Sequence, residues 1–221
     1  MKKAFTMLEL VFVIVIMGIL AASIIPSTRT NPVQEAAIQI LSDIRYTQHL
    51  AMVDDKYDAN NTKWYKERWQ IIFSSNSNSG SKMGYTIFSD TAGKSRGDPN
   101  PSEIAINPSN PSQIMTGGYT GSKKLDIDNK SFVGMKRLNI GRKYNIKNVV
   151  FSKSCNGANG SSKRIVFDHL GRPLQGNISG NKKAYESDNL IKSDCTITIS
   201  SSSESLKIVV EPETGYARIK F

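Results

Sequence analysis

Residues Met1 to Pro26 read Met-Lys-Lys-Ala-Phe-Thr-Met-Leu-Glu-Leu-Val-Phe-Val-Ile-Val-Ile-Met-Gly-Ile-Leu-Ala-Ala-Ser-Ile-Ile-Pro. Lys2 and Lys3 precede an apolar run that carries no charge from Leu10 to Ile25. A run of about 18–20 apolar residues is typical of a transmembrane helix, and basic residues before it favour a cytoplasmic N-terminus. A carboxylate at the centre of such a helix costs about 2.5–3.5 kcal/mol, so Glu9 predicts a function and a charged partner.

Two other interpretations of this segment remain open. A secretory signal peptide also has a basic start and an apolar core, and Ala21-Ala22-Ser23 fits a small-residue cleavage site. A single-pass membrane anchor explains the length of the apolar run and the two lysines. Glu9 fits neither, because it interrupts the apolar core of a signal peptide and has no role in a plain anchor.

The residues from Lys3 to Val11, Lys-Ala-Phe-Thr-Met-Leu-Glu-Leu-Val, resemble the processing site of the type IV pilin and type II secretion pseudopilin family. The resemblance implies that a prepilin peptidase cleaves between Ala4 and Phe5 and that the new N-terminus, Phe5, is N-methylated. Glu9 is then the fifth mature residue and Pro26 the twenty-second, both positions that the family uses. Ala4 stands where the family usually has Gly, and this departure predicts slower processing.

The resemblance also implies a role for Glu9. In the family, subunits leave the bilayer and pack their N-terminal helices into a filament core, where this carboxylate pairs with the terminal amine of a neighbour. A buried charge is costly unless it is paired with good geometry, so such a pair sets the register between subunits. We therefore expect Glu9 to act in assembly with Phe5 of the adjacent subunit as its partner, and Pro26 to kink the helix.

An amphipathic helix is expected after Pro26. Apolar residues recur there at intervals of three and four: Val33, Ala36, Ala37, Ile40, Leu41, Ile44 and Ala51. Asn31-Pro32 marks either a local break or a fresh first turn. If residues 5 to about 54 form one helix, its length is about 75 Å.

The remainder of the chain predicts a β-rich head. Short apolar segments alternate with Ser, Asn, Gly and Pro. The expected strands are Trp69–Phe73, Tyr85–Phe88, Ile104–Ile106, Val149–Phe151, Ile165–Phe167, Thr196–Ile199, Leu206–Val210 and Ala217–Phe221. Ser74–Ser81 is expected to be a hairpin loop.

The fold class is therefore α+β, with a long transmembrane and amphipathic N-terminal helix packed on an antiparallel β-sheet head, as in pilins. The expected organisation is a leader peptide at 1–4, a transmembrane or filament-core helix at 5–26, an amphipathic helix at 27–56 and a periplasmic head at 57–221.

A second resemblance lies in the head. The segment from Arg164 to Leu174, Arg-Ile-Val-Phe-Asp-His-Leu-Gly-Arg-Pro-Leu, resembles the strand and Gly-Arg-Pro segment of the GspH/FimT group of minor pseudopilins. The segment from Lys207 to Lys220 is similar to the final hairpin of that group, with Thr214-Gly215 at the turn. Arg68–Phe73 fits the first strand after the helix.

Cys155 and Cys195 are expected to form a disulfide. The N-terminal lysines place the head outside the cytoplasm, where thiols are oxidised. A bridge would hold Val149–Phe151 near Thr196–Ile199. Two free buried thiols are the alternative, and two cysteines without a nearby histidine do not make a zinc site.

No enzyme, cofactor or metal site is expected. The two histidines, His49 and His169, lie outside any nucleophile or metal motif. Asp126-Ile-Asp128-Asn129-Lys130 resembles a calcium loop only faintly, because Lys130 stands at a ligand position and the required Gly is missing.

Positive charge is concentrated in one segment. The chain has 29 basic and 19 acidic residues and a net charge of +10, and no acidic residue lies between Asp128 and Asp168. Such a block binds phosphates or is simply a solvated surface, and its candidate contacts are Lys136, Arg137, Arg142 and Lys143. DNA-uptake pilins of the FimT type bind DNA mainly through an Arg-rich C-terminal tail, whereas the tail here carries only Arg218 and Lys220.

The expected function is that of a minor pseudopilin in a type II secretion pseudopilus, with a minor type IV pilin that binds DNA for uptake as the alternative. The expected partners are other pseudopilins or pilins, the prepilin peptidase and methyltransferase, the inner-membrane assembly platform and, in the alternative, DNA. The expected location is the inner membrane, single-pass, with the head in the periplasm, and then the filament. Asp58-Ala59-Asn60-Asn61-Thr62 also matches an acidic N-glycosylation pattern of some bacteria.

Overall fold

The computed structural model describes residues 6–24, 31–91, 97–156, 162–186 and 189–220. The chain forms two compact units, Met1–Asn31 and Pro32–Phe221. Each is described by itself below. Ala4, Phe5 and Pro26 lie outside the described residues, as does the segment that would join the two helices into one.

The first unit contains one helix, α1 (Met7–Ile24), in which Glu9 is the only charged residue. Its large apolar side chains from Met7 to Leu20 are exposed. Among the described residues, no helix combines the length and the apolar content that a membrane crossing requires.

The second unit begins with α2 (Pro32–Val53). Proline is favoured at the first helical position because it has no N–H to leave unpaired there, and the fresh first turn at Pro32 is confirmed. The apolar stripe is confirmed too. Leu41 is partly buried, and the other six expected members are buried: Val33, Ala36, Ala37, Ile40, Ile44 and Ala51. α2 contacts strands of both sheets of the head.

The first sheet is antiparallel with the order β2-β1-β4-β5. Its strands are β1 (Trp69–Ser75), β2 (Met83–Ser89), β4 (Arg164–Phe167) and β5 (Pro173–Gln175). β1 and β2 form the expected hairpin, whose loop contains the 3₁₀ turn η3 (Ser77–Ser79). β5 was not expected, because it is three residues long and begins with Pro173, which cannot donate a ladder hydrogen bond.

The second sheet is also antiparallel, with the order β3-β6-β7-β8. Its strands are β3 (Asn148–Phe151), β6 (Cys195–Ser200), β7 (Ser205–Val210) and β8 (Ala217–Lys220). All four were expected within one or two residues of their bounds. The observed fold is therefore α+β with antiparallel sheets.

The described residues between β2 and β3, 90–91 and 97–147, have little regular structure. It contains η4 (Lys123–Leu125), η5 (Lys136–Leu138) and the short helix α3 (Ile140–Lys143). The expected strand Ile104–Ile106 makes only isolated bridges, from Ile104 to Phe88 and from Ile106 to Ile114. Prolines near both of its ends, Pro101 and Pro108, lack the N–H that would extend a ladder.

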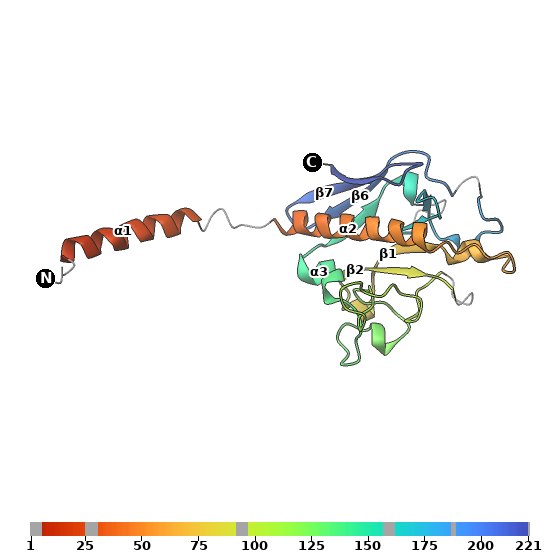
Figure 1. The fold of residues 1–221 in the computed structure, drawn as a ribbon, viewed down its shortest axis with the longest axis horizontal. Coiled ribbons are helices and arrows are strands. Elements are labelled where there is room, and N and C mark those ends of the chain that lie inside the picture. The colour runs from red at the N-terminus through yellow and green to blue at the C-terminus, as the bar shows by residue number, and fades with distance from the viewer. Residues whose placement is uncertain (1–5, 25–30, 92–96, 157–161, 187–188, 221) are drawn as a thin grey trace. The chain divides into compact units, whose positions relative to one another are not determined.

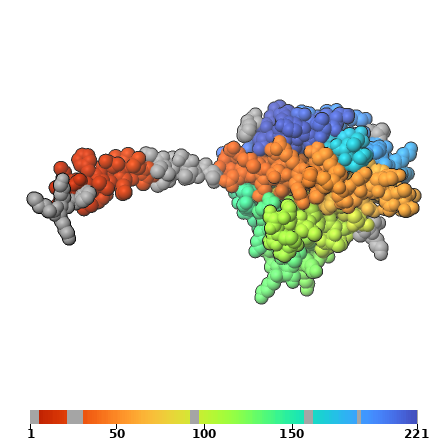
Figure 2. Space-filling model, viewed as in Figure 1, coloured from red at the N-terminus to blue at the C-terminus, as the bar shows by residue number. Residues whose placement is uncertain are grey.

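The core lies where α2 and the two sheets meet. The ring of Phe73 on β1 lies 5.3 Å from that of Tyr85 on β2 and 5.8 Å from that of Phe151 on β3, so aromatic contacts join the sheets. α2 runs across the head in Figure 1. In the space-filling view it forms part of the surface, between the C-terminal strands and the segment that follows β2 (Figure 2).

Three further 3₁₀ turns complete the described elements: η2 (Trp64–Glu67), η6 (Lys153–Cys155) and η7 (Ile178–Gly180). η2 leads from the loop after α2 into β1. η6 carries the first cysteine.

Candidate binding groove and assembly residues

The four expected phosphate contacts lie on two short turns that share a buried anchor. Leu138 at the end of η5 and Ile140 at the start of α3 are fully buried. Their burial fixes the backbone on both sides of Asn139, so that Lys136, Arg142 and Lys143 project into solvent. Packing of these two buried residues therefore places the cations of both turns on one surface.

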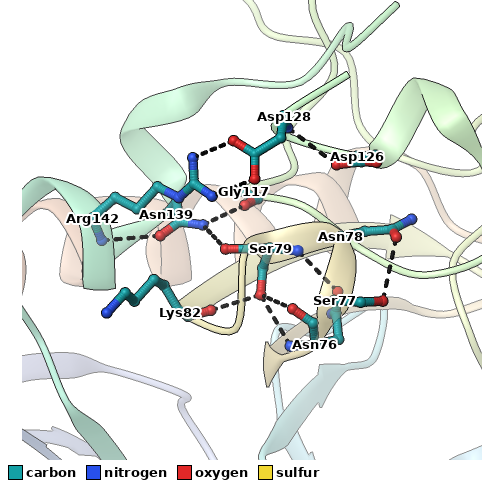
Figure 3. Close-up of polar contacts among 10 residues, drawn as sticks. All are labelled: Asn76, Ser77, Asn78, Ser79, Lys82, Gly117, Asp126, Asp128, Asn139 and Arg142. Carbon is teal, nitrogen blue, oxygen red and sulfur yellow. Dashed lines mark hydrogen bonds and ion pairs between the residues drawn. The ribbon is translucent and has the colours of Figure 1, made fainter.

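Asn139 holds this backbone in place. Its amide nitrogen donates to the carbonyl oxygens of Ser79 (2.9 Å) and Gly117 (3.0 Å), and its carbonyl accepts from the backbone N–H of Arg142 (3.0 Å). Figure 3 shows Asn139 between the β1–β2 hairpin loop and α3. Since Asn139 is completely buried, losing these bonds would leave the Gly117 carbonyl without a donor among the described residues, and the Ser79 carbonyl would keep only the longer bond from the Lys82 N–H (3.4 Å).

The hairpin loop is itself well ordered by polar contacts. Asn76 accepts from the N–H of Ser79 (3.0 Å), and the Ser79 hydroxyl accepts in return from the N–H of Asn76 (3.0 Å), which makes a capping box (Figure 3). The following residue, Gly80, has a φ of 65°, and a side chain there would overlap the guanidinium of Arg142. The position of Arg142 and Asn139 therefore depends on this loop, for which the sequence predicted only a hairpin connection.

A groove of about 460 Å³ lies on this surface. Its lining is Ile127, Asp128, Lys136, Arg137, Arg142 and Lys143. All four expected cations are present, together with one carboxylate. The concave surface and its positive charge are suited to an anion with several charges, such as a chain of phosphates.

Two of the four cations are neutralised by carboxylates. Arg142 donates to both oxygens of Asp128, at 2.7 and 2.6 Å (Figure 3). Arg137 donates to Asp43 on α2 at 3.2 Å. Within the described part of the chain, Lys136 and Lys143 make no ion pair, so they carry the uncompensated charge of the groove. The hydrogen bonds from Arg142 lower the pKa of Asp128.

Asp43 belongs to a buried polar network that connects α2 to the groove. The Tyr85 hydroxyl donates to Asp43 (2.5 Å) and accepts from Gln39 (2.7 Å), and the Tyr144 hydroxyl donates to Gln39 (2.9 Å). Burial raises the pKa of Asp43, against the opposing effects of Tyr85 and Arg137. Gln39 and Asp43 are one helical turn apart on α2, beside its apolar stripe. This spacing is the only feature of the sequence that could have predicted the network.

Arg164 is not part of the basic surface, although it belongs to the segment without acidic residues. It is 3% exposed, donates to Gln70 at 2.8 Å and lies over the ring of Phe88. At the C-terminal end of the chain, Arg218 pairs with Glu211 at 3.2 Å.

Glu9 lies in the first turn of α1, where its backbone N–H donates to the Thr6 carbonyl at 3.1 Å. The side chain of Glu9 is exposed. The cleavage site between Ala4 and Phe5 and the expected kink at Pro26 lie outside the described residues, so these expectations stay predictions.

The disulfide between Cys155 and Cys195 is present, with the two Cα atoms 5.2 Å apart and both residues fully buried. It joins η6 to the start of β6. The expected neighbourhood is confirmed, since Val149–Phe151 pairs with Ile197–Ile199.

The histidines lie apart from the groove lining and are exposed, His49 on α2 and His169 in the turn after β4. In the ranges that the structure describes, no group of three His, Cys, Asp or Glu side chains is close enough to hold a metal ion.

Comparison with known proteins adds no relative: no family model, no curated protein and no solved structure matches the chain.

Proposed function

We propose that this protein is a minor pseudopilin, a structural subunit that enters a periplasmic filament of a type II secretion system through its N-terminal helix. The observation that carries the proposal is the single carboxylate of α1. Glu9 is the only charged residue in an otherwise apolar helix of 18 residues. An isolated carboxylate among apolar side chains is costly, so its presence indicates a charged partner in the assembled state.

The head supports the same proposal. α2 begins at Pro32 and packs against both antiparallel sheets, so the helix and the sheets form one unit. A filament that packs its subunits through α1 would display such heads on its outside. The Cys155–Cys195 bridge suits a head exposed to the oxidising periplasm.

In this proposal Glu9 acts through charge rather than shape. The amine of Phe5 in the next subunit, created by cleavage after Ala4, would lie against the Glu9 carboxylate in the apolar filament core. Removing one partner of a buried pair leaves the other charge uncompensated, at a cost of about 3–5 kcal/mol. The pair would therefore disfavour every register except the one that brings the two charges together.

The proposal is tested by replacing Glu9→Gln, which keeps the shape and removes the charge, in the native host. Incorporation into sheared filaments and export of secreted proteins are measured, and mass spectrometry confirms cleavage before Phe5. We expect normal processing with incorporation reduced at least tenfold. Glu35→Gln, at an exposed carboxylate in the first turn of α2, is the matched control. Normal incorporation of the Glu9 variant, or a chain never cut after Ala4, would contradict the proposal.

A second candidate function is DNA capture by a minor type IV pilin, which the groove between η5 and α3 favours. Binding of cations to DNA phosphates releases counterions, so log K falls with log salt by about 0.9 per phosphate contact. If only Lys136 and Lys143 engage, the slope is about −2. If the two arginines leave their carboxylates, it approaches about −4.

Double-stranded DNA titrated against the purified chain over a salt series decides between these candidates. For DNA capture, Asp128→Asn should raise the affinity, because it frees Arg142, whereas Lys136→Gln with Lys143→Gln should abolish binding. Lys183→Gln with Lys192→Gln, at exposed lysines outside the groove, is the control of equal charge. Equal weakening by both double variants would leave only non-specific attraction and would remove this candidate.

A further inference from the structure

The chain contains four Asn-x-Ser/Thr sequences whose middle residue is not proline, at Asn60, Asn129, Asn159 and Asn177. This sequence is the acceptor pattern for N-linked glycans on exported proteins. Only the first has an acidic residue two positions before the asparagine, Asp58. Asn159 lies outside the described residues, so the structure allows only the other three sites to be compared for exposure and hydrogen bonding.

Asn60 lies in an exposed turn in the loop between α2 and η2, which projects from one end of the head in Figure 1. The turn is formed by Asp58, whose carboxylate accepts from the Asn60 N–H (2.8 Å) and whose carbonyl accepts from the Asn61 N–H (3.1 Å). Thr62 is exposed as well. In the described part of the chain, the side-chain amide of Asn60 makes no hydrogen bond, so both its nitrogen and its oxygen face solvent.

The base of the loop is anchored while its tip is open. The Trp69 indole donates to Asp54 at 2.8 Å, and the Asn61 side chain donates to Glu67 at 2.7 Å. The rings of Tyr57 and Trp64 contact edge to face, 5.3 Å apart. A transferase could therefore draw out the tip at Asn60 by breaking two exposed hydrogen bonds, without disturbing the core of the head.

In the other two described acceptor sequences, the asparagine side chain is already hydrogen-bonded within its own turn. Asn129 is half-buried, and its carbonyl accepts from the N–H of Ser131 at 2.9 Å. The carbonyl of Asn177 accepts from the N–H of Ser179 at 3.0 Å and from the buried Arg164 at 3.4 Å. In both, the asparagine is bonded to the residue that a transferase must recognise with it.

We propose that Asn60 is the N-glycosylation site of this protein, an inference that rests on the proposed export of the head. The donor is an oligosaccharide linked to a lipid through pyrophosphate. The amide nitrogen of Asn60 attacks C1 of the first sugar, the N–C1 bond forms and the C1–oxygen bond to pyrophosphate breaks. The lipid pyrophosphate leaves, the amide proton passes to a base of the transferase, and no atom is oxidised or reduced.

The full chain is produced in a bacterium that carries an oligosaccharyltransferase specific for acidic acceptor sequences together with its lipid-linked oligosaccharide. Intact mass and peptide mapping then measure occupancy. We expect one glycan on the peptide that contains Asn60, none in Asn60→Gln and at least a tenfold lower occupancy in Asp58→Ala. Asn129→Gln is the matched control and should leave occupancy unchanged.

Export is measured separately by thiol labelling, because an exported chain has the Cys155–Cys195 bridge and a retained chain has free thiols. Exported chain without added mass overturns the glycosylation site and leaves the proposed function standing. Retained chain points instead to failure of the proposed function. In that case the chain, purified in detergent and oxidised, is incubated with transferase and donor, and an unmodified product again overturns the site.

Discussion

Replacing Gly215→Ala tests why the head needs a glycine in its last hairpin. Gly215 lies between β7 and β8 with a φ of 64°, a conformation that side chains rarely adopt. Close by, the Gln48 side chain on α2 donates to the carbonyl of Thr214 (2.8 Å) and to that of Gly171 (2.9 Å). One glutamine thus joins the helix to the turns that follow β4 and β7.

The geometry at Gly215 determines the size of the effect. A Cβ atom there would overlap the carbonyl oxygen of Gly171 and lie 2.6 Å from the side-chain nitrogen of Gln48. The left-handed backbone costs about 1–2 kcal/mol for alanine. Loss of the two hydrogen bonds from Gln48 adds about 0.5–1.5 kcal/mol each. We expect the free energy of unfolding to fall by about 2–5 kcal/mol.

Urea denaturation of the purified chain in mild detergent, followed by circular dichroism, measures this change. Gly180→Ala is the matched control, since a Cβ atom there meets nothing within 4 Å and its φ is not positive; its effect should stay within about 0.5 kcal/mol. In the double variant with Gln48→Ala the cost should be about 1–3 kcal/mol below the sum of the single costs, because both changes remove the same two hydrogen bonds. A single-variant cost under about 0.5 kcal/mol, or strictly additive costs, would refute this account.

Three further predictions concern the groove, the disulfide and the buried network. Asn139→Ala should lower the free energy of unfolding by about 2–4 kcal/mol in urea denaturation, because the buried Gly117 carbonyl loses its donor and the Ser79 carbonyl loses the shorter of its two hydrogen bonds. Cys155→Ser with Cys195→Ser should cost about 4 kcal/mol by the loop-entropy relation for a sequence separation of 40. Because burial raises the pKa of Asp43 above its unfolded value, protonation favours the folded state. The wild type should therefore gain stability relative to Asp43→Asn as the pH falls from 7 to 4.

Each of these has a clear opposite result. Asn129→Ala removes one turn hydrogen bond from a half-buried side chain and should cost under about 1 kcal/mol. An equal cost for Asn139→Ala would contradict the anchoring role of Asn139. For the disulfide, the oxidised wild type is treated with a reductant, and labelling of both thiols shows that the bridge is broken. A free energy of unfolding that does not change on reduction would contradict the prediction. A constant difference between wild type and Asp43→Asn across that pH range would show that Asp43 titrates normally.

Local pattern predicted most of the regular structure of the head. The stripe in α2 and the strands β1, β2, β3, β4, β6, β7 and β8 follow from spacings of three to four and two residues, which depend on side-chain direction within a single element. The local pattern failed in two places: it did not predict β5, and it predicted a strand at Ile104–Ile106 where only isolated bridges form. Both are too short to have a period, and their pairing depends on neighbours far away in the chain.

The sequence by itself indicated the helix α2, seven of the eight strands that the structure describes, a disulfide between the two cysteines and four candidate cations for the groove. Tertiary structure alone decided how much of their charge is free, because a carboxylate neutralises whichever cation is near it in space. Asp43 lies 94 residues from Arg137 in the chain and is hydrogen-bonded to it. Arg164 belongs to the basic segment of the sequence but is buried in the head. Charge counted along the chain cannot show this, since Coulomb energy depends on distance and burial rather than on sequence separation.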